Sequence, residues 1–131
     1  MTRNPIVIDT CAFRDREFVR WLRDYRGRKI LPTAAYTELL VYFVGQKHRT
    51  KEDVRRWLGA TDVEIEPMSS IHAEKAAEHG IEGDDFHDHA MDYLIGAHAH
   101  TAPLVLITNN KKDFGFLGAR VWTPEELMRR G

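Results

Sequence analysis

Side chains that can bind a metal ion follow or interrupt four apolar runs in this sequence. They are Asp9, Glu38, Asp92 and Asn110. A buried strand that ends on Asp places the carboxylate at the edge of a sheet, where the fold can gather it with others. Carboxylates gathered in this way repel one another and shift their pKa values unless a cation joins them. The pattern indicates a metal site with oxygen ligands, and therefore chemistry on phosphates.

Hydrolysis of a phosphodiester needs an activated water and neutralisation of charge on the phosphoryl oxygens. Mg²⁺ or Mn²⁺ held by a few carboxylates can supply both, because these ions keep positions open for water and phosphate. Asp9, Glu38 and Asp92 fit this role, and either Asn110 or Asp113 could complete the site. Glu38 lies within an apolar segment, where an unpaired carboxylate is costly, so it needs a partner.

Asp88 is a further candidate metal ligand, because it lies four residues before Asp92 and would share its face of a helix. Two like charges on one face are unfavourable without a cation, so Asp88 could also lie just outside the ligand shell. The alternative is that Asp84, Asp85 and Asp88 simply favour the positive end of the helix.

The elements that must position these residues alternate between strand and helix. Strands are expected at residues 5–9, 29–32, 63–67, 103–108 and 119–122, and helices at 15–26, 34–45, 50–58, 71–79, 85–100 and from residue 124. This order predicts an α/β fold in which a mostly parallel sheet of about five strands lies between two helical layers, in a single domain spanning 1–131. Asp9 and Asn110 fall at carboxyl ends of strands, where such sheets bind ligands.

Charge is distributed unevenly along the chain, although its formal net charge is only -1. Residues 1–30 hold eight basic and four acidic side chains, whereas residues 62–92 hold ten acidic side chains and Lys75. Two solvated helix faces of opposite sign would explain this. A basic rim that holds a polyanion beside an acidic metal pocket would explain it equally well, with Arg14, Arg20 and Arg23 as the candidate RNA-binding residues.

Composition places the chain among cytoplasmic proteins that do not cross a membrane. It has 43% hydrophobic residues, yet no apolar stretch approaches the length of a membrane span. The only cysteine, Cys11, cannot form an internal disulfide and is expected to be inert.

Zinc binding is not predicted, because residues two apart on a helix point to different faces. The histidines with this spacing are expected at the surface: His87, His89, His98 and His100. Aromatic side chains at helical spacing, such as Trp21, are expected in the core rather than stacked on RNA.

Four segments together resemble the PIN-domain ribonucleases, and in particular the VapC-type toxins of toxin–antitoxin pairs. Ile6 to Phe13 is similar to the opening strand and first acid of that family, and Pro32 to Leu40 to the segment that carries its Glu. Asp92 to Ala99 is similar to the family's Asp-x-x-Ile-Ala-Ala-x-Ala helix, and Thr108 to Phe114 to its Thr-x-(Asp or Asn)-x-x-(Asp/His)-Phe turn.

The resemblance implies metal-dependent cleavage of RNA, with Asp9, Glu38 and Asp92 holding Mg²⁺ or Mn²⁺ and Thr108 orienting a ligand or water. It also implies a homodimer and a small cognate antitoxin that inserts a segment into the active-site groove. Where some members carry a fourth Asp this chain has Asn110, so a second metal ion is in doubt and Asp113 could take that place.

Other functions remain open at this stage. The chain could be a stand-alone RNA-processing nuclease, or a catalytically weak module that binds RNA without metal. An Asp-Thr pair after the first strand also occurs in phosphotransfer enzymes with an Asp nucleophile, but these need a second Asp two residues later, where this chain has Cys11.

Overall fold

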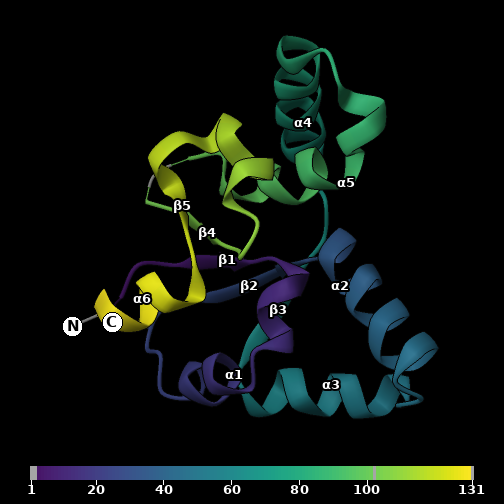
Figure 1. Cartoon of the computed structure of the whole chain (residues 1–131), viewed down its shortest axis with the longest axis vertical. Helices are drawn as coiled ribbons and strands as arrows, with labels where there is room; N and C mark the ends of the chain where they lie inside the picture. The colour runs from purple at the N-terminus through teal and green to yellow at the C-terminus, as the bar shows by residue number, and fades with distance from the viewer. Residues whose placement is uncertain (1–2, 102, 131) are drawn as a thin grey trace.

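The computed structural model describes residues 3–101 and 103–130, so Met1, Thr2, Ala102 and Gly131 of the predicted domain lie outside the described residues. Five parallel strands form one sheet in the order β3-β2-β1-β4-β5 (Figure 1). They are β1 (Ile6–Ile8), β2 (Lys29–Pro32), β3 (Val63–Glu66), β4 (Val105–Ile107) and β5 (Val121–Trp122). The predicted parallel sheet of about five strands is therefore confirmed.

Helices connect every pair of successive strands. The α-helices are α1 (Arg16–Leu22), α2 (Thr33–Leu40), α3 (Lys51–Ala60), α4 (Ser70–Gly83), α5 (Phe86–Gly96) and α6 (Pro124–Arg130). Shorter or irregular turns are η1 (Thr10–Arg14), η2 (Val41–Gln46), η3 (Ala97–Ala99) and η4 (Lys111–Arg120). α1 contacts α6, and α5 contacts α2 and α4, while α4 and α5 extend together from one end of the molecule (Figure 1).

The helices begin where the sequence provides capping side chains. Thr50 and Asp53 form a capping box at the start of α3, and Ser69 and His72 form one at the start of α4. The Asp15 carboxylate accepts a hydrogen bond from the Phe18 amide at the start of α1. Each cap satisfies amide groups that have no partner inside the helix, which explains why the predicted starts of α3 and α4 were accurate to within a residue.

The core surrounds the two central strands. Residues of β1 and β4 are buried on both faces of the sheet, and Ile8, Leu106 and Ile107 have no exposed surface. Such uninterrupted apolar runs are typical of central parallel strands, which helices cover on both sides. The centre of the sheet therefore provides a rigid edge from which polar side chains can project.

Two helical segments differ from the prediction. The apolar segment expected as one largely buried helix over 34–45 divides into α2 and the π-helical η2, where Val41 is 60% and Val44 is 39% exposed. The helix expected over 85–100 has non-helical backbone angles at His89 and ends in the 3₁₀ turn η3. Among the described residues, no helix is both long enough and apolar enough to cross a membrane.

Candidate active site

Asp9 lies directly after β1 and is held there by three donors. Its backbone amide donates to the Ile107 carbonyl, which extends the pairing of β1 with β4 by one residue. Its carboxylate accepts hydrogen bonds from the Thr10 amide at 2.9 Å and from the Thr108 hydroxyl at 2.8 Å, and the Cys11 thiol lies 3.4 Å away. Asp9 is only 6% exposed, so these donors fix one carboxylate at the carboxyl edge of the sheet.

Glu38 reaches the same region from α2, the helix that follows β2. The Thr10 hydroxyl lies 3.1 Å from Glu38 Oε1 and 3.0 Å from the Ala35 carbonyl, so Thr10 is the partner that a half-buried Glu38 requires. Burial raises the pKa of Glu38, and the nearby charges of Asp9 and Asp92 raise it further against the opposing hydrogen bond from Thr10. Glu38 therefore shares one electrostatic environment with the other two predicted acids.

Asp92 enters the site from α5. Burial raises its pKa, and the charges of Asp113 and Asp9 add to that effect. The imidazole of His89, one helical turn earlier, lies 3.4 Å from the Asp92 carboxylate and opposes the shift. Four carboxylates from separate segments thus influence one another across a common space.

The donor set of this acidic site fits Mg²⁺ or Mn²⁺. The facing groups are carboxylate oxygens, which both ions prefer. Like charges and burial both raise the cost of keeping these groups ionised, and a divalent cation would offset that cost. Asp9, Glu38 and Asp92 thus lie in one region of the fold, near enough for the charges of Asp9 and Asp92 to raise the pKa of Glu38 and for that of Asp113 to raise the pKa of Asp92.

Thr108 and Asn110 have supporting positions in this site. Thr108 is fully buried, and its hydroxyl donates to Asp9 while accepting a hydrogen bond from the Asn110 amide at 3.0 Å. Asn110 itself is exposed, and its carbonyl accepts from the amide of Asp113. Between the two candidates for the fourth position, the charge of Asp113 acts on Asp92, whereas Asn110 contributes through its backbone.

Asp88 does not share a helix face with Asp92 in the way that the four-residue spacing predicted. The backbone of His89 has φ −132° and ψ 28°, which interrupts α5 between the two residues. Asp88 is exposed and lines a cavity between α4 and α5 together with Asp84 and Asp85. The spacing argument for Asp88 therefore does not hold in this structure, and its role as a metal ligand stays a prediction.

The predicted RNA-binding arginines fall in two places. Arg14 ends η1, and its guanidinium lies 4.1 Å from the centre of the Tyr42 ring. Its charge lowers the pKa of Glu38 slightly against the stronger effect of burial. Arg20 and Arg23 instead line a cleft of about 400 Å³. Its other walls are mostly apolar, with two further arginines: Phe13, Arg16, Val19, Leu39, Phe43, Arg49, Val54, Trp57, Leu58 and Thr61.

Thr10, Cys11 and His89 contact the acids, although none was assigned a role from the sequence. The signals were present: Thr10 follows the first acid directly, and His89 lies three residues before Asp92 on a helix. The Cys11 thiol lies 3.4 Å from the Thr108 hydroxyl. Burial and the charge of Asp9 raise the pKa of Cys11, which agrees with the expectation of an unreactive thiol.

The expectation that the later histidines lie at the surface was wrong for His98. Only 1% of His98 is exposed, and its Nδ1 lies 2.6 Å from Glu66 Oε1. Burial lowers the pKa of His98, although Glu66 opposes this, and its ring stacks on that of His72 with 3.9 Å between the ring centres. Spacing along one helix could not reveal this, because both partners come from other elements.

Comparison with solved structures agrees with this architecture. One chain of VapBC-1 from nontypeable Haemophilus influenzae superposes with a TM-score of 0.64 at 18% identity, covering 92% of this chain and 98% of that one. A chain of DNA-bound VapBC from Salmonella typhimurium gives a TM-score of 0.66 at 20% identity, covering 93% of this chain and 99% of that one. No family model and no curated protein matches the sequence. At these identities the similarity concerns the fold, and it confirms the three-layer, PIN-like α/β/α fold that the motifs of the chain predicted.

Proposed function

We propose that this chain is a metal-dependent endoribonuclease and the toxin of a VapBC-type toxin–antitoxin pair. The observation that carries the proposal is the convergence of Asp9, Glu38 and Asp92: the charges of Asp9 and Asp92 raise the pKa of Glu38, and the charge of Asp9 raises the pKa of Asp92. A fold that brings carboxylates together at the carboxyl edge of a parallel sheet, against their repulsion, is expected to have a cation there. The similarity to VapBC chains supports the same reading.

Each residue of the site has a distinct part in this proposal. Asp9, Glu38 and Asp92 would hold Mg²⁺ or Mn²⁺, which when bound lowers the pKa of a water and neutralises phosphate charge. Thr10 keeps the carboxylate of Glu38 in place, and Thr108 does the same for Asp9. Asp113 adds negative charge beside Asp92 and would orient a water or a second cation.

Cleavage of a generic single-stranded RNA in Mg²⁺, Mn²⁺ or EDTA tests the nuclease assignment. A bound metal supplies several kcal/mol of charge stabilisation, so EDTA or Asp92→Asn should slow cleavage by about 100-fold or more. Asp84→Asn is the matched control, because Asp84 is exposed and its φ of 55° suits Asn. Equal rates for the two variants, or full activity in EDTA, would contradict the proposal and favour a metal-free RNA-binding module.

Arg14 is the basic residue best placed to hold RNA beside the acids. Its guanidinium is exposed, is oriented by stacking over Tyr42, and acts electrostatically on Glu38. Arg14→Ala should weaken RNA binding and reduce the slope of log affinity against log salt by about one unit. Fluorescence anisotropy at several salt concentrations measures this, with the exposed Arg26→Ala as the comparison. An unchanged slope in Arg14→Ala would show that Arg14 does not contact the RNA backbone.

The cleft that Arg20 and Arg23 line suits a segment of an antitoxin better than it suits bare RNA. Its apolar walls include Phe43 and Trp57, and its arginines favour acidic side chains. We therefore assign to this cleft a short protein segment that carries both apolar and acidic residues. A stand-alone RNA-processing nuclease would have no such partner.

Co-expression with any small reading frame found beside its gene tests this assignment. A complex of the two proteins is expected in size-exclusion chromatography, and Arg20→Glu should weaken it in calorimetric titration. Arg26→Glu makes the same charge change outside the cleft and should leave the affinity unchanged. If neither variant affects the complex, the antitoxin binds elsewhere; if no complex forms, the stand-alone nuclease is favoured.

The edge strand β3 and the segment after it are the surface that we assign to a homodimer. Ile65, Met68 and Ile71 are 38%, 43% and 56% exposed, and they lie within seven residues of one another in the sequence. Exposed apolar side chains on an edge strand are typical of surfaces that pair with another chain. Sedimentation equilibrium should show a dimer that Ile71→Lys dissociates, and a monomeric wild type would contradict the assignment.

A further inference from the structure

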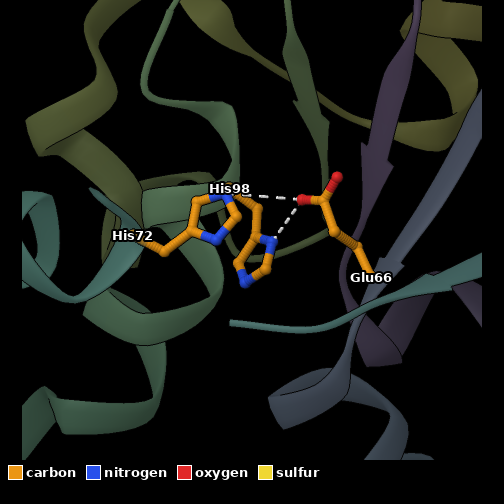
Figure 2. Close-up of side chains that lie close together, drawn as sticks. All are labelled: Glu66, His72 and His98. Atoms are coloured by element: carbon orange, nitrogen blue, oxygen red, sulfur yellow. Dashed lines mark hydrogen bonds and ion pairs between the residues drawn. The ribbon is translucent and has the colours of Figure 1, made fainter. Parts of the chain in front are cut away.

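Glu66, His72 and His98 form a cluster that is separate from the acidic site. Glu66 ends β3, His72 lies in the first turn of α4, and His98 lies in η3 after α5. Their side chains point toward one another (Figure 2), and one ligand atom from each lies within 4.8 Å of the other two. His98 is buried, while the side chains of His72 and Glu66 are 12% and 20% exposed. The cluster is thus largely closed but still accessible to a small ion.

The distances are close to those that a tetrahedral metal requires. Ligands about 2.0 to 2.1 Å from a tetrahedral Zn²⁺ lie about 3.4 Å from each other. Glu66 Oε1 is 3.5 Å from His72 Nε2 and 2.6 Å from His98 Nδ1. The first distance already fits, and the second is a hydrogen bond that would lengthen by less than 1 Å when an ion replaces the proton. The two imidazole rings are stacked in this structure, so one of them would turn to direct its nitrogen at the shared ion.

We propose that Glu66, His72 and His98 form a second metal site, which takes Zn²⁺ or a similar transition-metal ion. Two imidazoles and one carboxylate are the ligands that such ions prefer, whereas Mg²⁺ prefers oxygen alone. The donor atoms therefore separate this site from the carboxylates around Asp92. Three protein ligands leave one position for water, or for His100, whose ring centre lies 5.6 Å from that of His72.

Neighbouring groups can orient the ligands. When Nε2 of His72 binds a metal, its Nδ1 carries the proton and needs an acceptor. In this structure Nδ1 accepts a hydrogen bond from the Ser69 amide at 3.0 Å, so metal binding would replace that bond with one from Nδ1 to the Ser69 hydroxyl, which lies 3.2 Å away. Arg28 lies 3.5 Å from Oε2 of Glu66, so it pairs with the oxygen that does not face the histidines. Glu66 can therefore keep its ion pair while Oε1 binds the ion.

A metal here would join three elements that are far apart in sequence. It would tie the end of β3 to the start of α4 and to η3, which continues directly from the helix that carries Asp92. Because α4 and α5 extend from the end of the molecule (Figure 1), this link would hold their base against the sheet. The role is structural, and so it can be measured without any assay of RNA cleavage.

Zn²⁺ titration of chelator-treated protein in excess Mg²⁺ tests the proposal. One Zn²⁺ should bind per chain, raise the unfolding temperature, and shift the imidazole ¹⁵N resonances of His72 and His98. Loss of an outer partner alone costs about 10- to 100-fold in metal affinity, so His72→Gln should weaken binding by at least about tenfold. Gln at this position preserves the capping box with Ser69, so the variant is expected to fold.

Two further variants serve as controls for the Zn²⁺ affinity of His72→Gln. His87→Gln removes an exposed histidine at the start of α5 and should leave Zn²⁺ affinity unchanged. Asp92→Asn changes the acidic site and should also leave it unchanged. The proposal is overturned if wild type binds no Zn²⁺, if His72→Gln binds it as tightly as wild type, or if Asp92→Asn abolishes binding. None of these results depends on whether the chain cleaves RNA.

Discussion

Replacement of Thr108 by Val tests how the fold positions Asp9. Thr108 is fully buried, and its hydroxyl donates to the Asp9 carboxylate at 2.8 Å, accepts from the Asn110 amide at 3.0 Å and lies 3.4 Å from the Cys11 thiol. Val has almost the same shape, so the change removes the interactions of the hydroxyl without opening a cavity. The loss of stability therefore reports the polar interactions of one hydroxyl.

The expected cost follows from the charge and burial of Asp9. A hydrogen bond to a charged group contributes about 1.5 to 3 kcal/mol, and a buried acceptor that loses its donor costs a similar amount. Because Asp9 keeps the Thr10 amide as a donor, we expect Thr108→Val to lower the free energy of unfolding by about 2 kcal/mol. Thr108→Ser keeps the hydroxyl and loses one methyl group, which should cost about 1 kcal/mol.

Urea unfolding in EDTA, combined with Asp9→Asn in a double-mutant cycle, isolates the pair. Asn at position 9 carries no charge, so Thr108→Val should cost less in that background, with a coupling energy of about 1 kcal/mol. A coupling energy below about 0.3 kcal/mol would refute the reasoning. So would a Thr108→Val variant that is no less stable than Thr108→Ser.

Further predictions concern ionisation of the acidic site and close packing beside it. Burial and neighbouring carboxylates raise the pKa of Glu38, so its contribution to stability is fully present below the unfolded value of about 4.3 and is lost as pH rises through the folded pKa. In urea titrations over that pH range, metal-free wild type should therefore lose stability relative to Glu38→Gln. Added Mg²⁺ should restore the lost stability in wild type but not in Glu38→Gln. Parallel pH profiles for the two proteins would contradict this prediction. Gly96→Ala places a Cβ 2.7 Å from the Phe116 ring and should cost about 1 to 3 kcal/mol of unfolding free energy. A Cβ at Gly59 in α3 has no atom nearby, so Gly59→Ala should stabilise the chain by about 0.5 to 1 kcal/mol. A loss of stability in Gly59→Ala would contradict the packing explanation for Gly96→Ala.

Local patterns in the sequence were sufficient to predict most elements of the fold. The apolar runs of β1 and β4 predicted strands of a parallel sheet, and Thr50 and Ser69 marked the starts of α3 and α4. Burial of a strand and capping of a helix both depend on residues that are close in sequence, which explains this success. The acids Asp9, Glu38 and Asp92 could be chosen for the same reason, since each interrupts or ends an apolar run.

Helix continuity was less predictable, because packing competes with local preference. The apolar side chains of residues 41–46 predicted burial, yet the π-helical turn leaves Val41 and Val44 exposed. Likewise the spacing of Asp88 and Asp92 predicted a shared helix face, but the backbone at His89 departs from helical geometry. Spacing rules assume an unbroken helix. A single residue with non-helical backbone angles changes the direction in which the preceding side chains point.

By itself, therefore, the sequence determined the order of the elements, the parallel sheet and the carboxylates at its edge. Only the tertiary structure decided which partners these groups have: Thr108 for Asp9 across 99 residues, and Glu66 for His98 across 32. It also brought the charge of Asp113 near enough to raise the pKa of Asp92. The physical reason is that electrostatic and hydrogen-bond partners are set by distance in space, whereas periodicity and capping report only on neighbours along the chain.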